Sequence, residues 1–330
     1  MSTRSQGIYA RPIAETPIAV LDFETTGLAP GLDRVVEVSL VRREPQASPS
    51  LVLNTLVNPQ RHVAATEIHG ITDEDVADAP VFAEIGAALL QALSGCVLAS
   101  YNIYFDLAFL EYELSQIGVR DSPPHFCLMY LRPMLGLGNR CTLETACQSY
   151  GIPHSVTHVS AADSMAAARL LEIYLREMQQ KGIATFEDLS RLKKYKFTTS
   201  FARDPLSRDP RSPARQAAKV KSRSETRGKP QLSSQIASTS VSSAAALGSY
   251  WDQLEMFLSD LEITEQEFCE LEERRRTLGL KDEQVRVLHA RAFSSALLRY
   301  TTDEWLDEVE TLKLRLLYRC LHRLGWAPGE

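Results

Sequence analysis

Residues 18–27 have the sequence Ile18-Ala19-Val20-Leu21-Asp22-Phe23-Glu24-Thr25-Thr26-Gly27, and they decide how the first half of the chain is interpreted. A short apolar run that ends in acids and a glycine is typical of a buried strand followed by a turn. Because side chains alternate along a strand, Asp22 and Glu24 lie on the same face. Two carboxylates this close repel each other, and a bound Mg²⁺ or Mn²⁺ removes the conflict. An isolated pair of acids also fits a solvated strand end, so the surrounding sequence has to decide.

The rest of the first half alternates strand and helix patterns, which predicts an α/β domain. Strands are expected at 18–23, 35–41, 51–57 and 96–99, and helices at 81–93, 105–117, 142–151 and 160–178. Three strands in succession before the first long helix indicate hairpin pairing, and therefore a mixed central sheet.

Two further acids occupy comparable positions in this half. Asp106 stands near the start of a helix that follows the buried strand at 96–99, and Asp163 lies near the start of the helix at 160–178. His158 precedes Asp163 by five residues, and His154 lies four residues earlier still. Together with Asp22 and Glu24, these residues make a set of four acids and two candidate histidines.

In order and spacing, the four acids and His158 resemble the three motifs of the DEDDh group of DnaQ-like 3′–5′ exonucleases. That group includes the proofreading epsilon subunit of bacterial replicative polymerase. The segments 65–76 and 142–153 resemble further parts of the family, so the resemblance extends over about residues 18–177. It implies a ribonuclease H-like exonuclease fold, in which helices flank a mixed central sheet.

The resemblance also implies a reaction. The four acids would hold two Mg²⁺ or Mn²⁺ ions, one lowering the pKa of a water and one stabilising the leaving 3′ oxygen. His158 would be the general base, because imidazole titrates near neutral pH and the spacing to Asp163 matches the family. His154 is the alternative base, although its spacing departs from the family pattern. The expected products are nucleoside monophosphates released from single-stranded DNA ends.

The resemblance assigns seven further residues to the pocket of the terminal nucleotide, five as contacts and two, Asn102 and Phe105, as residues that brace it. The seven are Thr25, Thr26, Leu28, Ile68, His69, Asn102 and Phe105. For Leu28, Ile68 and Phe105 the alternative is plain core packing. Because stacking and backbone contacts accept any base, we expect an exonuclease without sequence preference.

The net charge of −6 averages over three segments that differ in charge. Residues 1–190 carry 12 basic and 22 acidic side chains, residues 191–249 carry 13 and 3, and residues 250–330 carry 11 and 17. The middle segment is rich in Ser and Pro and lacks a hydrophobic pattern, which predicts a flexible linker. Its positive charge would supply phosphate affinity, with a solubilising linker as the alternative. The expected division is an N-terminal arm at 1–16, an exonuclease domain at 17–190, the linker at 191–249 and a helical bundle at 250–330.

The overall composition is that of a globular protein. The chain has 330 residues, 44% of them hydrophobic and 24% charged, which suits about two domains. No apolar run approaches the ~18–20 residues of a membrane span, and residues 1–10 do not resemble a signal peptide. A cytoplasmic location is therefore expected. Six cysteines without a Cys-x-x-Cys pair predict neither a zinc site nor a disulfide framework.

Residues 250–330 show helical periodicity and no strand pattern. Capping boxes are expected at Thr264 with Glu267 and at Thr301 with Glu304. The stretch 278–289 weakly resembles the tellurite-resistance protein B-like regions attached to some bacterial exonucleases, which implies a role in partner docking or self-association. The segment Gln253-Leu254-Glu255-Met256-Phe257 approximates the pentapeptide that binds the bacterial sliding clamp. The alternative, which the helical period favours, is a helix that packs on the bundle.

Three functions remain open at this point. The leading one is a Mg²⁺- or Mn²⁺-dependent 3′–5′ exonuclease that acts on DNA in repair or proofreading. The second is an exoribonuclease that acts on short or structured RNA. The third is an adaptor, associated with nucleic acid or a polymerase, whose nuclease is vestigial. The presence of all four acids and the histidine counts against the third.

Overall fold

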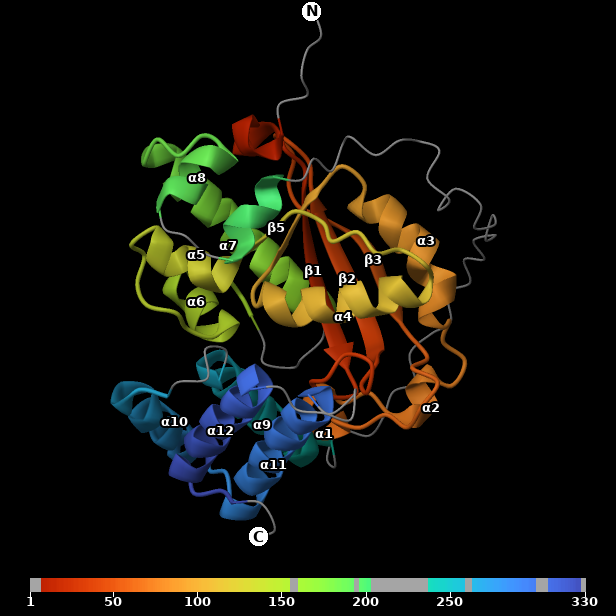
Figure 1. Ribbon diagram of the computed structural model, residues 1–330, viewed down its shortest axis with the longest axis vertical. Helices are drawn as coiled ribbons and strands as arrows, with labels where there is room; N and C mark the ends of the chain where they lie inside the picture. The colour runs from red at the N-terminus through yellow and green to blue at the C-terminus, as the bar shows by residue number, and fades with distance from the viewer. Residues whose placement is uncertain are drawn as a thin grey trace, which may run out of the picture.

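The computed structural model describes residues 7–154, 160–192, 196–202, 237–258, 263–300 and 308–327. Within these residues an α/β half occupies the upper part of Figure 1, and a helical half lies beneath the carboxyl end of its first strand.

The centre of the α/β half is one mixed sheet of five strands in the order β3-β2-β1-β4-β5. The first three strands pair antiparallel, and the last two run parallel to the first. The strands are β1 (Ile18–Thr25), β2 (Val35–Arg43), β3 (Ser50–Leu56), β4 (Val97–Ser100) and β5 (His125–Cys127). The expected mixed sheet is confirmed. Strand β5 was not predicted, because three residues are too few to show a period.

Three long helices cover the sheet. Helices α3 (Phe82–Leu93) and α4 (Ile103–Gln116) lie on one face, and α7 (Ser160–Gln180) packs against β1 and β2 from the other (Figure 1). The shorter helices are α1 (Thr66–His69), α2 (Asp73–Val76), α5 (Leu128–Met134), α6 (Leu143–Ser149) and α8 (Phe186–Leu192), with 3₁₀ turns η1 (Ile8–Ala10) and η2 (Ile13–Glu15). A helix-flanked sheet is the expected layer arrangement.

Two stretches of the expected linker are helical instead. A 3₁₀ turn, η3 (Lys196–Ala202), buries Phe197 and Phe201 completely, with Phe201 packed on Phe186 of α8. Helix α9 (Ala237–Leu258) begins well before the expected boundary at residue 250. The linker prediction is therefore wrong at both ends, because aromatic and apolar anchors in a polar stretch gain their burial from tertiary packing. Residues 203–236, with most of the basic charge, lie outside the described residues.

The helical half contains α9, α10 (Glu265–Thr277), α11 (Asp282–Tyr300) and α12 (Glu308–Arg323). The capping box at the start of α10 is confirmed, since Thr264 Oγ1 accepts from Glu267 N at 3.2 Å and Glu267 Oε2 accepts from Thr264 N at 3.0 Å. The box expected at Thr301 and Glu304 falls outside the described residues. Among the described helices, none combines the length and apolar character that a membrane crossing needs.

Candidate active site

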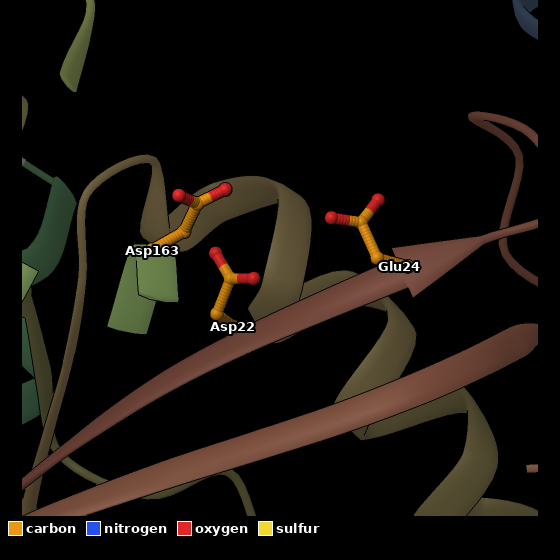
Figure 2. A group of neighbouring side chains, drawn as sticks. All are labelled: Asp22, Glu24 and Asp163. Carbon is orange, nitrogen blue, oxygen red and sulfur yellow. The ribbon is translucent and has the colours of Figure 1, made fainter. Parts of the chain in front are cut away.

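Strand β1 brings Asp22 and Glu24 to the same face of the sheet, as the alternation predicts. Carboxylate oxygens of Asp22, Glu24 and Asp163 lie within 4.8 Å of one another, at the carboxyl end of β1 (Figure 2). Hard divalent cations prefer oxygen ligands, so these three side chains fit such an ion.

Hydrogen bonds to β2 fix the start of α7, and with it Asp163. Ser39 Oγ on β2 lies 2.7 Å from Ser164 Oγ. Two residues earlier on the same face of β2, Glu37 Oε2 accepts a hydrogen bond from the Ser160 backbone N–H at 3.3 Å. Both contacts lie in the first turns of α7, so β2 determines where Asp163 meets the acids of β1.

Asp106 lies in the first turn of α4 and is buried. Its Oδ1 accepts from the Phe23 backbone N–H at 3.0 Å, between the two acids of β1, and its Oδ2 accepts from Ser100 Oγ at 2.5 Å. It is not one of the three side chains that meet within 4.8 Å. Burial raises the pKa of Asp106 to about 7, although its hydrogen bonds oppose the shift.

The acids of the site destabilise one another's charged forms. Burial raises the pKa of Asp22 well above its ordinary value, and the charges of Asp106 and Asp163 add to this. Burial, with the charge of Asp22, does the same to Glu24. A divalent cation would reverse this situation, because it neutralises the mutual repulsion.

Of the two candidate histidines, the structure describes only His154. His158 lies outside the described residues, so its role stays a prediction. His154 Nε2 lies 2.7 Å from Asp163 Oδ1. Burial lowers the pKa of His154, but the hydrogen bond to Asp163 and its negative charge outweigh this, and the net shift is upward. His154 therefore contacts the site, whereas the sequence spacing argued only against its role as the general base.

The residues expected to hold the nucleotide mostly share one cavity with the acids. Thr25, Leu28, Ile68, His69, Asn102 and Phe105 line it together with Asp22, Glu24, Asp106 and Asp163. Thr26 is not among the lining residues: its Oγ1 bonds to Asp33 at 3.1 Å and accepts from Arg34 N at 3.1 Å. Its hydroxyl holds the turn after β1 rather than facing the cavity. Gly27 belongs to that turn, since a Cβ there would lie 2.5 Å from the Asp33 carboxylate.

A family model described as "Exonuclease", RNase_T, matches residues 19–171. Residues 19–171 thus resemble an exonuclease domain.

Known proteins are similar to this chain over about half of its length. A DNA polymerase III subunit epsilon-like protein of Rhodobacter capsulatus is 34% identical over 53% of this chain and 26% of its own length. The DNA polymerase III subunit epsilon of Pasteurella multocida is 28% identical over 47% of this chain and 66% of its own length. Among solved structures, an Exonuclease I from Methylocaldum szegediense is 20% identical, with a TM-score of 0.41, over 51% of this chain and 42% of that chain. This chain thus spans less than two thirds of each of these curated relatives.

Side chains from outside residues 19–171 complete the cavity. Trp251, Asp252, Glu255 and Met256 of α9 line it, as does Arg291 of α11. The sequence did not predict this, because nothing local to α9 indicates which surface it covers. Leu254, Met256 and Phe257 are buried, which agrees with helix packing rather than a free clamp-binding segment at 253–257.

Proposed function

We propose that the exonuclease domain of this chain removes nucleoside monophosphates from the 3′ end of single-stranded DNA by divalent-metal-dependent hydrolysis. The observation that carries the proposal is the meeting of Asp22, Glu24 and Asp163 within 4.8 Å, with Asp106 buried next to β1. The relatives named as polymerase III epsilon subunits support DNA as the substrate and proofreading or repair as the setting. An exoribonuclease is the alternative, and no contact among the described residues of the cavity favours it.

The four acids would hold Mg²⁺ or Mn²⁺, with Asp22, Glu24 and Asp163 around one ion and Asp106 completing the site of a second. When bound, such ions lower the pKa of a water and stabilise negative charge on the reacting phosphate. The protein's own part is to hold these acids in place through β1, α4 and the first turn of α7.

His158 would take the proton from the attacking water, because its spacing to Asp163 is that of the family. His154 would orient Asp163 through the Nε2 contact at 2.7 Å. Leu28, Ile68, Asn102 and Phe105 would hold the terminal nucleotide at the lined cavity. The basic charge at 203–236 would add phosphate affinity, although this segment lies outside the described residues.

Cleavage of labelled oligonucleotides by the purified full chain tests the proposal. A single-stranded DNA and an RNA of the same sequence, both labelled at the 5′ end, are incubated with Mg²⁺, Mn²⁺ or EDTA. We expect a ladder that shortens from the 3′ end of the DNA, needs the metal and falls by about 10³-fold or more in Asp22→Asn. Asp78→Asn makes the same change at an exposed position and is expected to keep full activity. Cleavage that persists in Asp22→Asn would refute the site, and faster cleavage of RNA would favour the alternative.

The two histidines are separated by matched substitutions. We expect His158→Gln to lower kcat by about 10²–10⁴-fold, as loss of a general base does. His154→Gln is expected to cost about tenfold or less and to leave the low-pH limb of the kcat profile in place. A larger loss in His154→Gln, with disappearance of that limb, would transfer the base role to His154.

A further inference from the structure

Helix α9 forms part of the wall of the catalytic cavity. It packs beside α1, the short helix that carries Ile68 and His69 (Figure 1). Trp251 and Met256 of α9 line the cavity and are only 6% and 4% exposed. Side chains that belong to the helical half therefore fill space next to the proposed nucleotide contacts.

One of those nucleotide contacts is already bonded to α9. Asn102 Nδ2 donates a hydrogen bond to Glu255 Oε1 at 3.1 Å. A nucleotide that bound through the Asn102 amide would have to displace Glu255. In the described arrangement the protein thus occupies part of its own substrate site.

The charge that α9 presents to the cavity is unfavourable for nucleic acid. Beyond the effect of burial, the charge of Asp252 raises the pKa of Asp22, and the charge of Asp106 raises that of Glu255, yet neither Asp252 nor Glu255 belongs to the group that meets within 4.8 Å. Asp252 therefore adds negative charge without adding to that group of ligand oxygens, whereas burial raises the pKa of Glu255 to about 8 and favours its neutral form. Arg291 is the one Lys or Arg among the described lining residues, so acids outnumber it. A phosphate entering this space meets like charge at short range, which opposes binding.

We propose that α9 is an intramolecular lid, which excludes the nucleic acid strand from the cavity until the helical half moves away from it. The proposal rests on the exonuclease function proposed above. It implies that the chain exists in a closed state, described by the structure, and an open state that binds the strand. Activity is then set by the balance between the two.

A cluster of contacts outside the acid site holds the closed state, and we call it the latch. In the latch, Arg274 of α10 forms an ion pair with Glu144 of α6, and Ser249 Oγ of α9 donates to Glu144 Oε2 at 3.4 Å. Nearby, Arg140 Nη2 lies 3.5 Å from Glu267 Oε1. Because Glu144 and Arg274 do not line the cavity, they can be changed without altering a proposed metal or nucleotide contact.

Charge reversal in the latch tests the lid. Arg274→Glu places like charges opposite each other and should favour the open state. We expect kcat/KM on single-stranded DNA to rise about fivefold or more. Arg276→Glu makes the same change on an exposed position of the same helix, and it should leave kcat/KM unchanged. The double variant Glu144→Arg, Arg274→Glu restores an ion pair with its charges exchanged and should return the rate toward that of the wild type.

Strand binding provides the second measurement. In an Asp22→Asn background, Arg274→Glu should tighten binding of a fluorescent oligonucleotide by a similar factor. A decrease in kcat/KM for Arg274→Glu, or an equal rise for Arg276→Glu, would overturn the lid. A decrease would indicate instead that α9 forms part of the substrate-binding site. Metal-dependent cleavage by the wild type that Asp22→Asn abolishes would leave the nuclease proposal intact in either case. Absence of cleavage in both the wild type and Arg274→Glu would instead refute the nuclease proposal itself.

Discussion

Acid is expected to unfold the helical half through His289. This side chain of α11 is 1% exposed, and its Nε2 lies 3.0 Å from the hydroxyl of Tyr250 in α9. Burial lowers its pKa from 6.5 to about 4, and the positive charge of Arg275 acts in the same direction. The folded protein therefore keeps His289 neutral where the unfolded chain protonates it. Its stabilising contribution is complete above pH 6.5 and is lost as the pH falls toward 4. The shift amounts to a loss of about 2 kcal/mol at pH 5 and about 3 kcal/mol at pH 4.

Tryptophan fluorescence measures this unfolding selectively, because the three tryptophans of the chain, Trp251, Trp305 and Trp326, all follow residue 249. Urea titrations at pH 7, 6, 5 and 4.5 give the free energy of unfolding at each pH. His289→Gln keeps a polar group opposite Tyr250 but cannot titrate, so its stability should vary less with pH by about 2 kcal/mol between pH 7 and 5. An equal pH dependence in both proteins, or a pKa near 6.5 for His289 by NMR, would contradict the reasoning.

Three further outcomes are expected. Mn²⁺ added to EDTA-treated protein should stabilise the α/β half by about 2.7 kcal/mol when the Mn²⁺ concentration is a hundred times Kd. Calorimetry with and without Mn²⁺ should show this as a higher Tm. Arg34→Met leaves the Glu113 carboxylate, 1% exposed and held by two 2.7 Å bonds, without its partner and should cost about 3–5 kcal/mol in urea unfolding followed by circular dichroism. Arg191→Met, which removes an exposed pair, should cost under about 1 kcal/mol in the same titration. Gly27→Ala would place a Cβ against the Asp33 carboxylate, so the turn after β1 must shift, and the protein should lose about 1–3 kcal/mol of stability. Because this turn adjoins the cavity, KM should rise; an unchanged KM would show that the turn does not affect substrate binding.

Much of the catalytic half follows from local pattern. The apolar run before Asp22 and the alternation of side chains were enough to predict β1, the shared face of Asp22 and Glu24, and hairpin pairing with β2. The position of Asp163 near the start of α7 was equally visible, because its helix has a long amphipathic period.

The remaining features depend on contacts between distant segments. No local pattern predicts that Ser100 and the Phe23 N–H donate hydrogen bonds to Asp106. Nor does any predict that α9 lines the cavity. The linker was predicted too long for the same reason: Phe197 is buried only because other elements surround it. His154 shows a further limit, since its contact with Asp163 does not follow from its spacing along the sequence.

The bonds that hold the acids in place span large distances along the chain. Phe23 and Asp106 are 83 residues apart, Glu37 and Ser160 are 123 apart, and Ser39 and Ser164 are 125 apart. Contacts of such separation form late in folding, because the intervening chain must be closed into loops first. During synthesis from the N-terminus, the carboxylates of β1 can meet Asp163 only after α7 has emerged from the ribosome. A nascent chain shorter than about 165 residues therefore lacks the acid cluster, and competence to bind metal arises in one step when the domain closes.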